Sequence, residues 1–410
     1  MASWWVTEGK AKAGNDMTAW SGVLPDHLPD AAVERVDHAI LRPPGAEDMN
    51  GLRQACGVFR ADGSAVDAAR TLSLEGELTM PVPCPPRPTQ LRAGAWLFGG
   101  LLYHHFGHAL IYSAARLWAV RRLLEDGVAL RGVVFHRRYT DDPAASPILP
   151  RNAEAIFAVF GPDVPLTAAG AIEQVETLYV PSQGISTTRE LFLGLPEQRR
   201  FYRDCAAKIP PNAERRDIYV SRTKTGWKGN HLFEREIERA LAEAGYLIYH
   251  PQSHDLAHQI ATYRSARRLI AVDGSALHVV ATAVPPEAKV AVITRREFFA
   301  WAIADQIRAF AGCETHVIEA HGDVYAFSRG MGRPASWSKT QVTTDFARLG
   351  TALVAAGFLA RAPDWQLPSP DDLAARLAEA AAKIGDPLVP VPDHLRPKEP
   401  YYQAHLRTNG

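Results

Sequence analysis

Two strand ends in the second half of the sequence carry polar residues suited to binding a phosphate. Ser221-Arg222 follow the apolar run 217–220, and Asp273-Gly274-Ser275 follow the apolar run 269–272. A Gly-Ser turn that opens a helix exposes backbone N–H groups at the positive end of the helix dipole. Arg222 adds a forked cation that matches phosphate oxygens. Each feature alone is commonly an ordinary turn or a surface cation, but together in one sheet they indicate a phosphate site.

A histidine cluster forms a second candidate site, at a predicted junction between a strand and a helix. His104, His105 and His108 follow two glycines, and the last two are three residues apart, so they share a helical face. Three interpretations stay open: capping and core packing, chelation of a metal, or a polar cluster that faces a substrate. The second lacks a glutamate in the motif and an obvious third ligand. For the third, a histidine of pKa about 6.5 can act as a general base at neutral pH.

Three further residues belong to the same question. Tyr112 follows His108 by about one helical turn. With an ordinary pKa of about 10, a tyrosine is a poor base, so Tyr112 either orients His108 by a hydrogen bond or only packs. His254 and His258 either line a cleft or lie on the surface.

The strand ends belong to a region, 217–296, in which strand and helix patterns alternate. Strands are expected at 217–220, 247–249, 269–272 and 290–293. Helices are expected from Asn230, which can cap one, to Gly245, at 255–265, and from Ser275. Repeated β-α-β units predict a parallel sheet with helices on both faces. Such sheets bind ligands outside the carboxyl ends of their strands.

The remaining sequence gives a longer set of expected elements. Before residue 210 we expect strands at 33–41, 57–71 with an Asp62-Gly63 turn, 95–98 ended by Gly99-Gly100, 133–135 and 174–180, and helices at 105–125, 152–160 and 187–207. After residue 293 we expect helices at 298–310, 346–355 and 371–384, a strand at 315–318, and an irregular tail from Gly385.

Several of these runs share a pattern with one known family. The matching runs are 99–108 with 116–119, 219–222, the helix after Asn230, Gln259, 274–278 and, more weakly, 345–350 with 357–359. In this order and spacing, across about 96–359, the sequence resembles glycosyltransferase family 61. Members carry a similar His-Phe-Gly-His helix start followed by Arg-Leu-Trp.

The resemblance implies an α/β fold of GT-B type, with two Rossmann-like domains, a central cleft and a C-terminal helical extension. It implies inverting sugar transfer from a nucleotide-activated donor, without an obligatory metal or a cofactor. The catalytic candidates are His105, His108 and Tyr112, although many relatives have a carboxylate where Tyr112 stands. The donor-binding candidates are Ser221, Arg222, Lys224, Gln259, Gly274, Ser275, Ala276, Leu277 and His278.

The length and composition fit two domains of a globular protein. The chain has 410 residues, 45 basic and 45 acidic residues, and 47% hydrophobic residues, so nothing indicates a nucleic-acid binder. We expect an acceptor-side domain at 1–209, a nucleotide-sugar-binding domain at 210–330, and helices and a tail at 331–410 that can return to the first domain. Scattered cysteines and the lack of a signal-like or membrane-spanning stretch predict a cytoplasmic protein, with peripheral membrane contact still open.

The sequence therefore predicts a glycosyltransferase that uses a nucleotide-sugar donor and a glycan or lipid-linked glycan acceptor, in a setting such as surface polysaccharide synthesis. Two alternatives stay open. One is a nucleotide-sugar-binding protein that has lost catalysis, suggested by Tyr112. The other is a metal-dependent hydrolase built on the histidine cluster.

Overall fold

The computed structural model of the chain describes residues 30–50, 53–73, 76–86, 88, 90–137, 149, 151–188, 191–226, 229–295, 299–328 and 340–392. The chain forms two compact units, and the change from one to the other falls between Lys208 and Ile209. Each unit contains a sheet with parallel strands and several helices, so the expected α/β class is confirmed. No helix within the described ranges combines the length and the apolar character that crossing a bilayer requires.

A six-stranded mixed sheet forms the centre of unit 1. Its order is β10-β9-β8-β11-β1-β4, in which the first four strands run parallel, β1 pairs antiparallel with β11, and β4 pairs antiparallel with β1. These strands are β1 (Val33–Arg42), β4 (Gly57–Phe59), β8 (Leu91–Leu101), β9 (Leu130–His136), β10 (Leu166–Ala169) and β11 (Glu173–Pro181). Short pairings add β2 (Met49–Asn50), β3 (Arg53–Ala55), β5 (Leu72–Ser73), β6 (Gly76–Glu77) and β7 (Thr79–Met80).

Strand β8 corrects the prediction that Gly99-Gly100 end a strand, because it continues through both glycines to Leu101. A Cβ at Gly99 would lie 2.2 Å from the ring of Phe135 on the neighbouring strand β9. Gly100 has a φ of 95° and marks a register shift between β8 and β9. The glycines therefore allow close packing and a bulge within the strand. The expected Asp62-Gly63 turn is confirmed, with Gly63 at a φ of 84°. The strand expected at 57–71 is wrong beyond Phe59, because only a single bridge joins Phe59 to Ala65 and a 3-10 helix follows at Asp67–Ala69.

The helix expected at 105–125 is interrupted, which is a second correction. It consists of α1 (Phe106–His108), a π-helix at Ala109–Ser113 and α2 (Trp118–Glu125). The N–H of Ala114 donates to the carbonyl of Ala109 at 3.1 Å, which closes the wide π turn. The Ser113 hydroxyl accepts the Tyr103 N–H at 3.0 Å and so ties this turn to the end of β8.

Arg116 explains why the chain leaves the helical path. Its side chain is fully buried, and its guanidinium donates to the carbonyls of Pro181, Ala68 and Arg70. A continuous helix would direct this cation elsewhere and leave the three carbonyls unsatisfied. The other helices of unit 1 are α3 (Arg151–Phe160), as predicted, and α4 (Pro196–Ala207). Helix α4 is shorter than the predicted 187–207 because the described residues before Pro196 form turns and loop.

Unit 2 is built on a five-stranded, fully parallel sheet, which confirms the β-α-β prediction. The strands are β12 (Arg216–Val220), β13 (Leu247–Tyr249), β14 (Ala266–Val272), β15 (Lys289–Ile293) and β16 (Glu314–Ile318). Their spatial order is β13-β12-β14-β15-β16. The chain therefore fills one side of β12 first and then continues on the other side, starting with β14. This reversal is the topological switch point at which open α/β sheets bind ligands.

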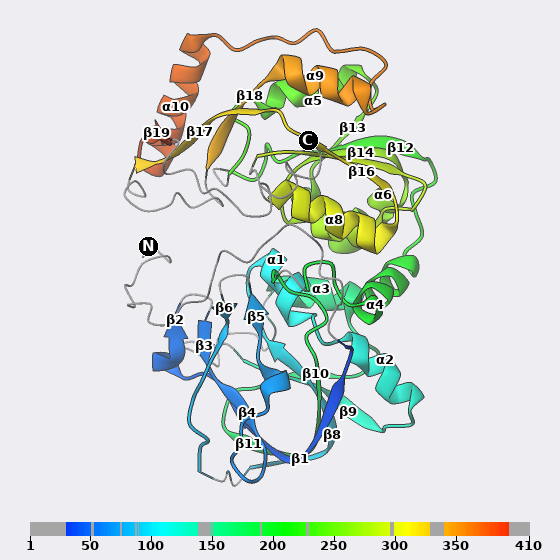
Figure 1. Cartoon of the computed structure of the whole chain (residues 1–410), viewed down its shortest axis with the longest axis vertical. Coiled ribbons are helices and arrows are strands. Elements are labelled where there is room, and N and C mark those ends of the chain that lie inside the picture. Colours follow the sequence, from blue (N-terminus) through cyan, green and yellow to red (C-terminus); the bar gives the residue numbers. More distant parts are fainter. Residues whose placement is uncertain are drawn as a thin grey trace. The chain divides into compact units, whose positions relative to one another are not determined.

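Helices cover both faces of this sheet (Figure 1). Helices α5 (Glu234–Glu243) and α9 (Phe346–Ala355) share one core with the inward side chains of β12, β14 and β15. The opposite face carries α6 (Leu256–Arg264), α7 (Ala276–Ala283) and α8 (Phe299–Ala311). All five helices were predicted within a few residues of these bounds.

A small antiparallel sheet completes unit 2. It joins β17 (His321–Phe327), β18 (Gln341–Thr344) and β19 (Leu388–Pro390), and helix α10 (Pro370–Ile384) packs beside it. None of these strands was predicted. The tail from Gly385 was expected to be irregular, but β19 forms a strand within it.

Candidate functional site

The carboxyl ends of β12 and β14 bring Arg222 and Gly274 into direct contact. A Cβ added to Gly274 would lie 2.2 Å from Nη1 of Arg222 and 3.2 Å from its Cζ. The other terminal nitrogen, Nη2, donates to the carbonyl of Gly229 at 3.0 Å. The guanidinium therefore rests on the Gly274 turn, at the switch point of the sheet.

A buried carboxylate fixes the backbone at Arg222. Glu234 is 1% exposed, and its Oε1 accepts the Arg222 N–H at 2.7 Å and the Tyr219 hydroxyl at 2.8 Å. Burial raises the pKa of Glu234, and the hydrogen bond from Arg222 opposes this rise. Asn230 was predicted to cap the helix, but Phe233 occupies that position and α5 begins at Glu234. The loop thus depends on Glu234, which the sequence marked only as an acidic residue of the first turns.

Ser221 is held within the same loop. Its hydroxyl donates to Glu238 Oε1 at 2.5 Å and accepts the Thr223 N–H at 3.0 Å. Thr223 also donates to Glu238, at 2.8 Å. Lys224, the next predicted donor residue, has an exposed side chain on the same loop. These contacts give the loop a fixed backbone path around Arg222.

The turn after β14 supplies backbone donors. The N–H groups of Leu277 and His278 bond to the carbonyls of Gly274 and Ser275. Within the described part of the chain, the N–H groups of Ser275 and Ala276 have no such acceptor, as is usual in the first turn of a helix. They point out from the start of α7, beside the Arg222 guanidinium that rests on Gly274.

Two of the other predicted donor residues face inward. The Leu277 side chain is fully buried. His278 is 6% exposed, and its Nδ1 lies 2.5 Å from Oε1 of Gln306 on α8. Because that oxygen can only accept, Nδ1 carries the proton and His278 is held in one tautomer. Gln259 donates to the carbonyls of Pro251 and His254, so it fixes the loop after β13.

A further pair at this edge was not anticipated from the sequence. Asp273 is fully buried, and Oδ2 accepts the backbone N–H of Arg295 at 2.7 Å. Its Oδ1 lies 3.4 Å from Nη2 of the same residue, whose side chain is also buried. A carboxylate between Val272 and Gly274 was visible in the sequence, but its partner is 22 residues away, beyond the next strand.

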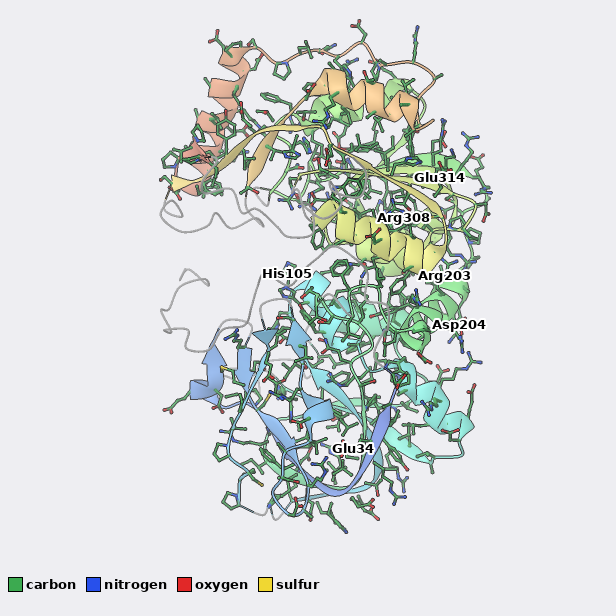
Figure 2. The ribbon with its side chains drawn as sticks, in the orientation of Figure 1. Glu34, His105, Arg203, Asp204, Arg308 and Glu314 are labelled. Atoms are coloured by element: carbon green, nitrogen blue, oxygen red, sulfur yellow. The ribbon has the colours of Figure 1, made fainter. Side chains whose placement is uncertain are left out.

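The histidine cluster lies in unit 1, at the carboxyl end of β8. His105 precedes the first turn of α1 and is exposed (Figure 2). Its ring lies 4.7 Å from that of His108, which in turn lies 5.7 Å from the ring of Tyr112. Tyr112 is 3% exposed, and its hydroxyl is 2.8 Å from that of Thr187. The three predicted catalytic residues therefore form one row of rings that starts at an exposed histidine.

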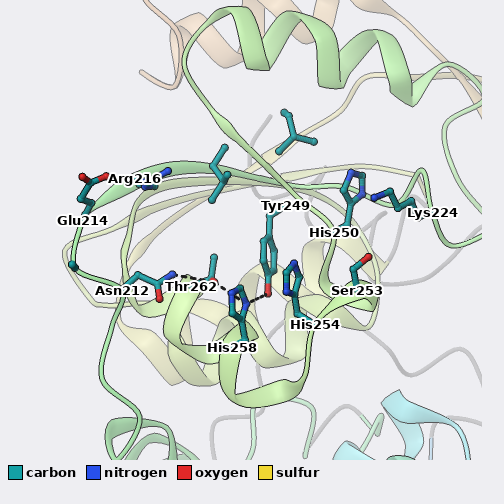
Figure 3. A pocket seen from close by; sticks show the side chains of 13 residues that line it. Asn212, Glu214, Arg216, Lys224, Tyr249, His250, Ser253, His254, His258 and Thr262 are labelled. Carbon is teal, nitrogen blue, oxygen red and sulfur yellow. Dashed lines mark hydrogen bonds and ion pairs between the residues drawn. The ribbon is translucent and has the colours of Figure 1, made fainter.

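The π-helix at Ala109–Ser113 sets the position of Tyr112 relative to His108 in this row of rings. Residues four apart come closer to one face in a π-helix than in an α-helix, and such segments are frequent at functional sites. Within the described residues, no group of three or more His, Cys, Asp and Glu side chains gathers as a metal site would require. Of the other two histidines, His254 and His258 are both exposed and line a pocket of unit 2 (Figure 3).

Comparison with known proteins gives one match to a family profile. The profile of the family described as Glycosyltransferase 61 matches residues 106–291, which include His108, Tyr112 and both strand ends. One similar solved structure is the bacterial iron-containing dodecameric glycosyltransferase TibC from enterotoxigenic E. coli H10407, at 10% identity. That match covers 66% of this chain and 80% of that chain with a TM-score of 0.24, which is too low to establish a common fold. A search of curated proteins found no match.

Proposed function

We propose that this chain, a glycosyltransferase by the match of its residues 106–291 to the family 61 profile, transfers a sugar from a nucleotide-activated donor to a glycan or glycoconjugate acceptor. We further propose that the transfer inverts the anomeric centre and needs no divalent metal. The observation that carries this proposal is the contact between Arg222 and Gly274 at the switch point of the unit 2 sheet.

The chemistry of the leaving group supports the assignment. A nucleoside diphosphate gains negative charge as the bond to the sugar breaks, so positive potential there must strengthen along the reaction. Arg222 carries a full charge at every relevant pH, and its Nη1 lies against the Gly274 turn while Nη2 donates to the carbonyl of Gly229. The N–H groups of Ser275 and Ala276 add the positive end of the α7 dipole. Together they supply the charge compensation that a divalent ion supplies in other transferases.

Hydrogen bonds to two glutamates fix the backbone around this site. Glu234 holds the Arg222 N–H, and Glu238 holds Ser221 and Thr223. Preorganised donors lose little free energy to reorganisation when charge develops, and this gives them their catalytic effect. In the proposed site Arg222, Ser275 and Ala276 contact the diphosphate. Ser221, Gln259, Leu277 and His278 act through the loops and the helix that they fix, whereas the side chain of Lys224 lines a pocket beside β13 instead.

The acceptor hydroxyl needs a general base, and His105 or His108 is proposed for this role. Both belong to the row of rings at the end of β8, and His105 is exposed there. Tyr112 bonds to Thr187 and packs beside His108, so its proposed role is to position that ring. A histidine removes the proton without the extreme pKa shift that a tyrosine would need.

The proposed architecture is GT-B, in which two Rossmann-like domains face each other across a cleft. Support comes from the family and from the division of the chain into two α/β units. In this arrangement unit 2 binds the donor and unit 1 the acceptor. We place the reaction in the cytoplasm, on a glycan or lipid-linked glycan destined for a surface polysaccharide.

A thermal-shift screen of nucleotides and nucleotide sugars tests the proposal. A nucleoside diphosphate at about 100 times its Kd adds about 2.7 kcal/mol to the free energy of unfolding. The nucleotide sugar that shares this nucleoside should then give a transferred product whose anomeric configuration, read by NMR, is opposite to that of the donor. Stabilisation by no nucleotide, or a product with retained configuration, would contradict the proposal.

A further inference from the structure

A pocket of about 490 Å³ follows the free edge of the unit 2 sheet, beside β13 (Figure 3). Its walls come from the segment before β12, from β13, from the loop after β13 and from α6. The lining runs from Arg216, the first residue of β12, to Lys224 in the loop after the last residue of β12, Val220. A five-residue parallel strand spans about 13 Å between its end Cα atoms. The pocket therefore suits an elongated ligand rather than a single compact ring.

One wall consists of flat rings. Tyr249, His254 and His258 lie nearly parallel: the two histidine rings are 4.1 Å apart at 8°, and Tyr249 is 5.0 Å from His254 at 12°. The Tyr249 hydroxyl lies 3.0 Å from Nδ1 of His258 and holds that ring in place. Burial raises the pKa of Tyr249 to about 12, so the hydroxyl keeps its proton. Because these rings stack on one another, they offer their edges and one outer face of the stack, on which a sugar ring can pack.

The open edge of the sheet adds polar groups. The carbonyl of Tyr249 accepts the Ser221 N–H at 2.8 Å, on the side of β12. In a parallel ladder, successive residues direct their backbone groups to opposite sides, so Ile248 directs its N–H and C=O to the pocket side. No described strand pairs with β13 there. A ligand with many hydroxyl groups can satisfy such an edge, which water satisfies otherwise.

The charges of the lining residues indicate the charge of the ligand. Arg216 pairs with Glu214 at 2.6 Å, and Glu214 is the one carboxylate among the lining residues. Lys224 is exposed at the other end, and no described carboxylate lies within ion-pair distance of it. His250 lies between, and burial lowers its pKa, so it is mostly neutral. The lining therefore carries a net positive charge, because Glu214 offsets Arg216 at one end and Lys224 remains at the other.

We propose that this pocket is an ancillary site for an acidic oligosaccharide, separate from the transfer centre at Arg222. The charge and the extended shape of the ligand follow from the pocket itself, whereas its being a carbohydrate rests on the proposed function. The ring stack holds a sugar ring, the Ile248 backbone meets hydroxyl groups, and Lys224 meets an acidic group, while Arg216 adds a second cation whose charge is shared with Glu214.

Calorimetric titration of the full chain tests this site without any turnover, so its result does not depend on the transfer assay. The probes are tetragalacturonate, a hyaluronan tetrasaccharide and tetrasialic acid, with maltotetraose as the neutral comparison. At least one acidic probe should bind about tenfold more tightly than maltotetraose, since a charged hydrogen bond contributes about that factor. Binding by none of them, or equal binding of maltotetraose, would overturn the proposal.

Matched variants test which residues bind the probe. His254→Ala and Arg216→Ala should each weaken the acidic probe about fivefold or more, which corresponds to the loss of one contact. Gln252→Ala and Arg215→Ala are the controls, because these exposed neighbours do not line the pocket, and they should leave affinity within about twofold. Equal effects of both sets would contradict the assignment. Displacement of the probe by UDP, GDP or ADP would also do so, because it would make the pocket part of the donor site.

Discussion

Gly274→Ala is the substitution that most directly exploits the packing of Arg222 on the turn. The added Cβ would lie 2.2 Å from Nη1 of Arg222, whereas an ordinary contact needs at least 3.4 Å. The guanidinium must therefore move by about 1.2 Å, the difference between these distances, and this disturbs the 3.0 Å bond from its Nη2 to the carbonyl of Gly229. Gly274 has a backbone conformation open to alanine, so the effect should reach the ligand through Arg222.

The expected loss is that of one charged hydrogen bond, about 1.5–3 kcal/mol, or about 10-fold to 150-fold in affinity for the nucleoside diphosphate. Because both changes remove one interaction, Arg222→Ala combined with Gly274→Ala should be no weaker than Arg222→Ala alone. Calorimetry on the four proteins measures this cycle. The control is Gly170→Ala, whose Cβ would meet an arginine side chain, that of Arg137, at an ordinary 3.8 Å. Losses that add in the double variant would refute the coupling of Gly274 to Arg222.

Three other outcomes follow from the same structure. Transfer activity should survive EDTA, because Arg222 and the start of α7 meet the diphosphate; complete loss restored by Mg²⁺ or Mn²⁺ would refute this. At least one of His105→Ala and His108→Ala should lower kcat by about 10²-fold with folding intact, and Tyr112→Phe should lower it less; a larger effect of Tyr112→Phe would reverse the assigned roles. Burial lowers the pKa of His136 and of His231 to about 3. The unfolded chain, with a pKa of about 6.5, binds more protons between these values, so each histidine should remove about 2 kcal/mol of stability as the pH falls from 6.5 to 5. Urea unfolding at pH 7 and pH 5 measures this loss, and His136→Gln should reduce it; an unchanged pH dependence in that variant would rule out His136.

The elements of unit 2 could be predicted because their signals are local. Each parallel strand is a short apolar run, each helix has an apolar face, and Gly245 ends α5 in the left-handed conformation, at a φ of 88°. Strand β17 was missed because it contains glycine and charge and gains its stability from partners far along the chain. Its partner Pro390 in β19, for example, is 65 residues from Tyr325. The local periodicity of a sequence does not predict pairing between residues so far apart.

The break in the 105–125 helix has a similar origin. Nothing near Arg116 in the sequence indicates that its guanidinium satisfies three carbonyls from 65, 48 and 46 residues away. The same limit applies to the candidate site. Turn chemistry identified Arg222 and Gly274, but their contact, the hold of Glu234 on the loop and the bond of His278 to Gln306 depend on the folded sheet.

The central claim is that Arg222 receives the phosphates of the donor at the switch point. The most direct measurement is calorimetric titration of the stabilising nucleoside diphosphate into the wild type, Arg222→Ala and Arg235→Ala. Arg235 is an exposed arginine of α5 and serves as the matched control. Affinity should fall by about 10-fold to 150-fold in Arg222→Ala and stay within about threefold in Arg235→Ala. Unchanged affinity in Arg222→Ala, with the protein folded, would mean that the phosphates bind elsewhere.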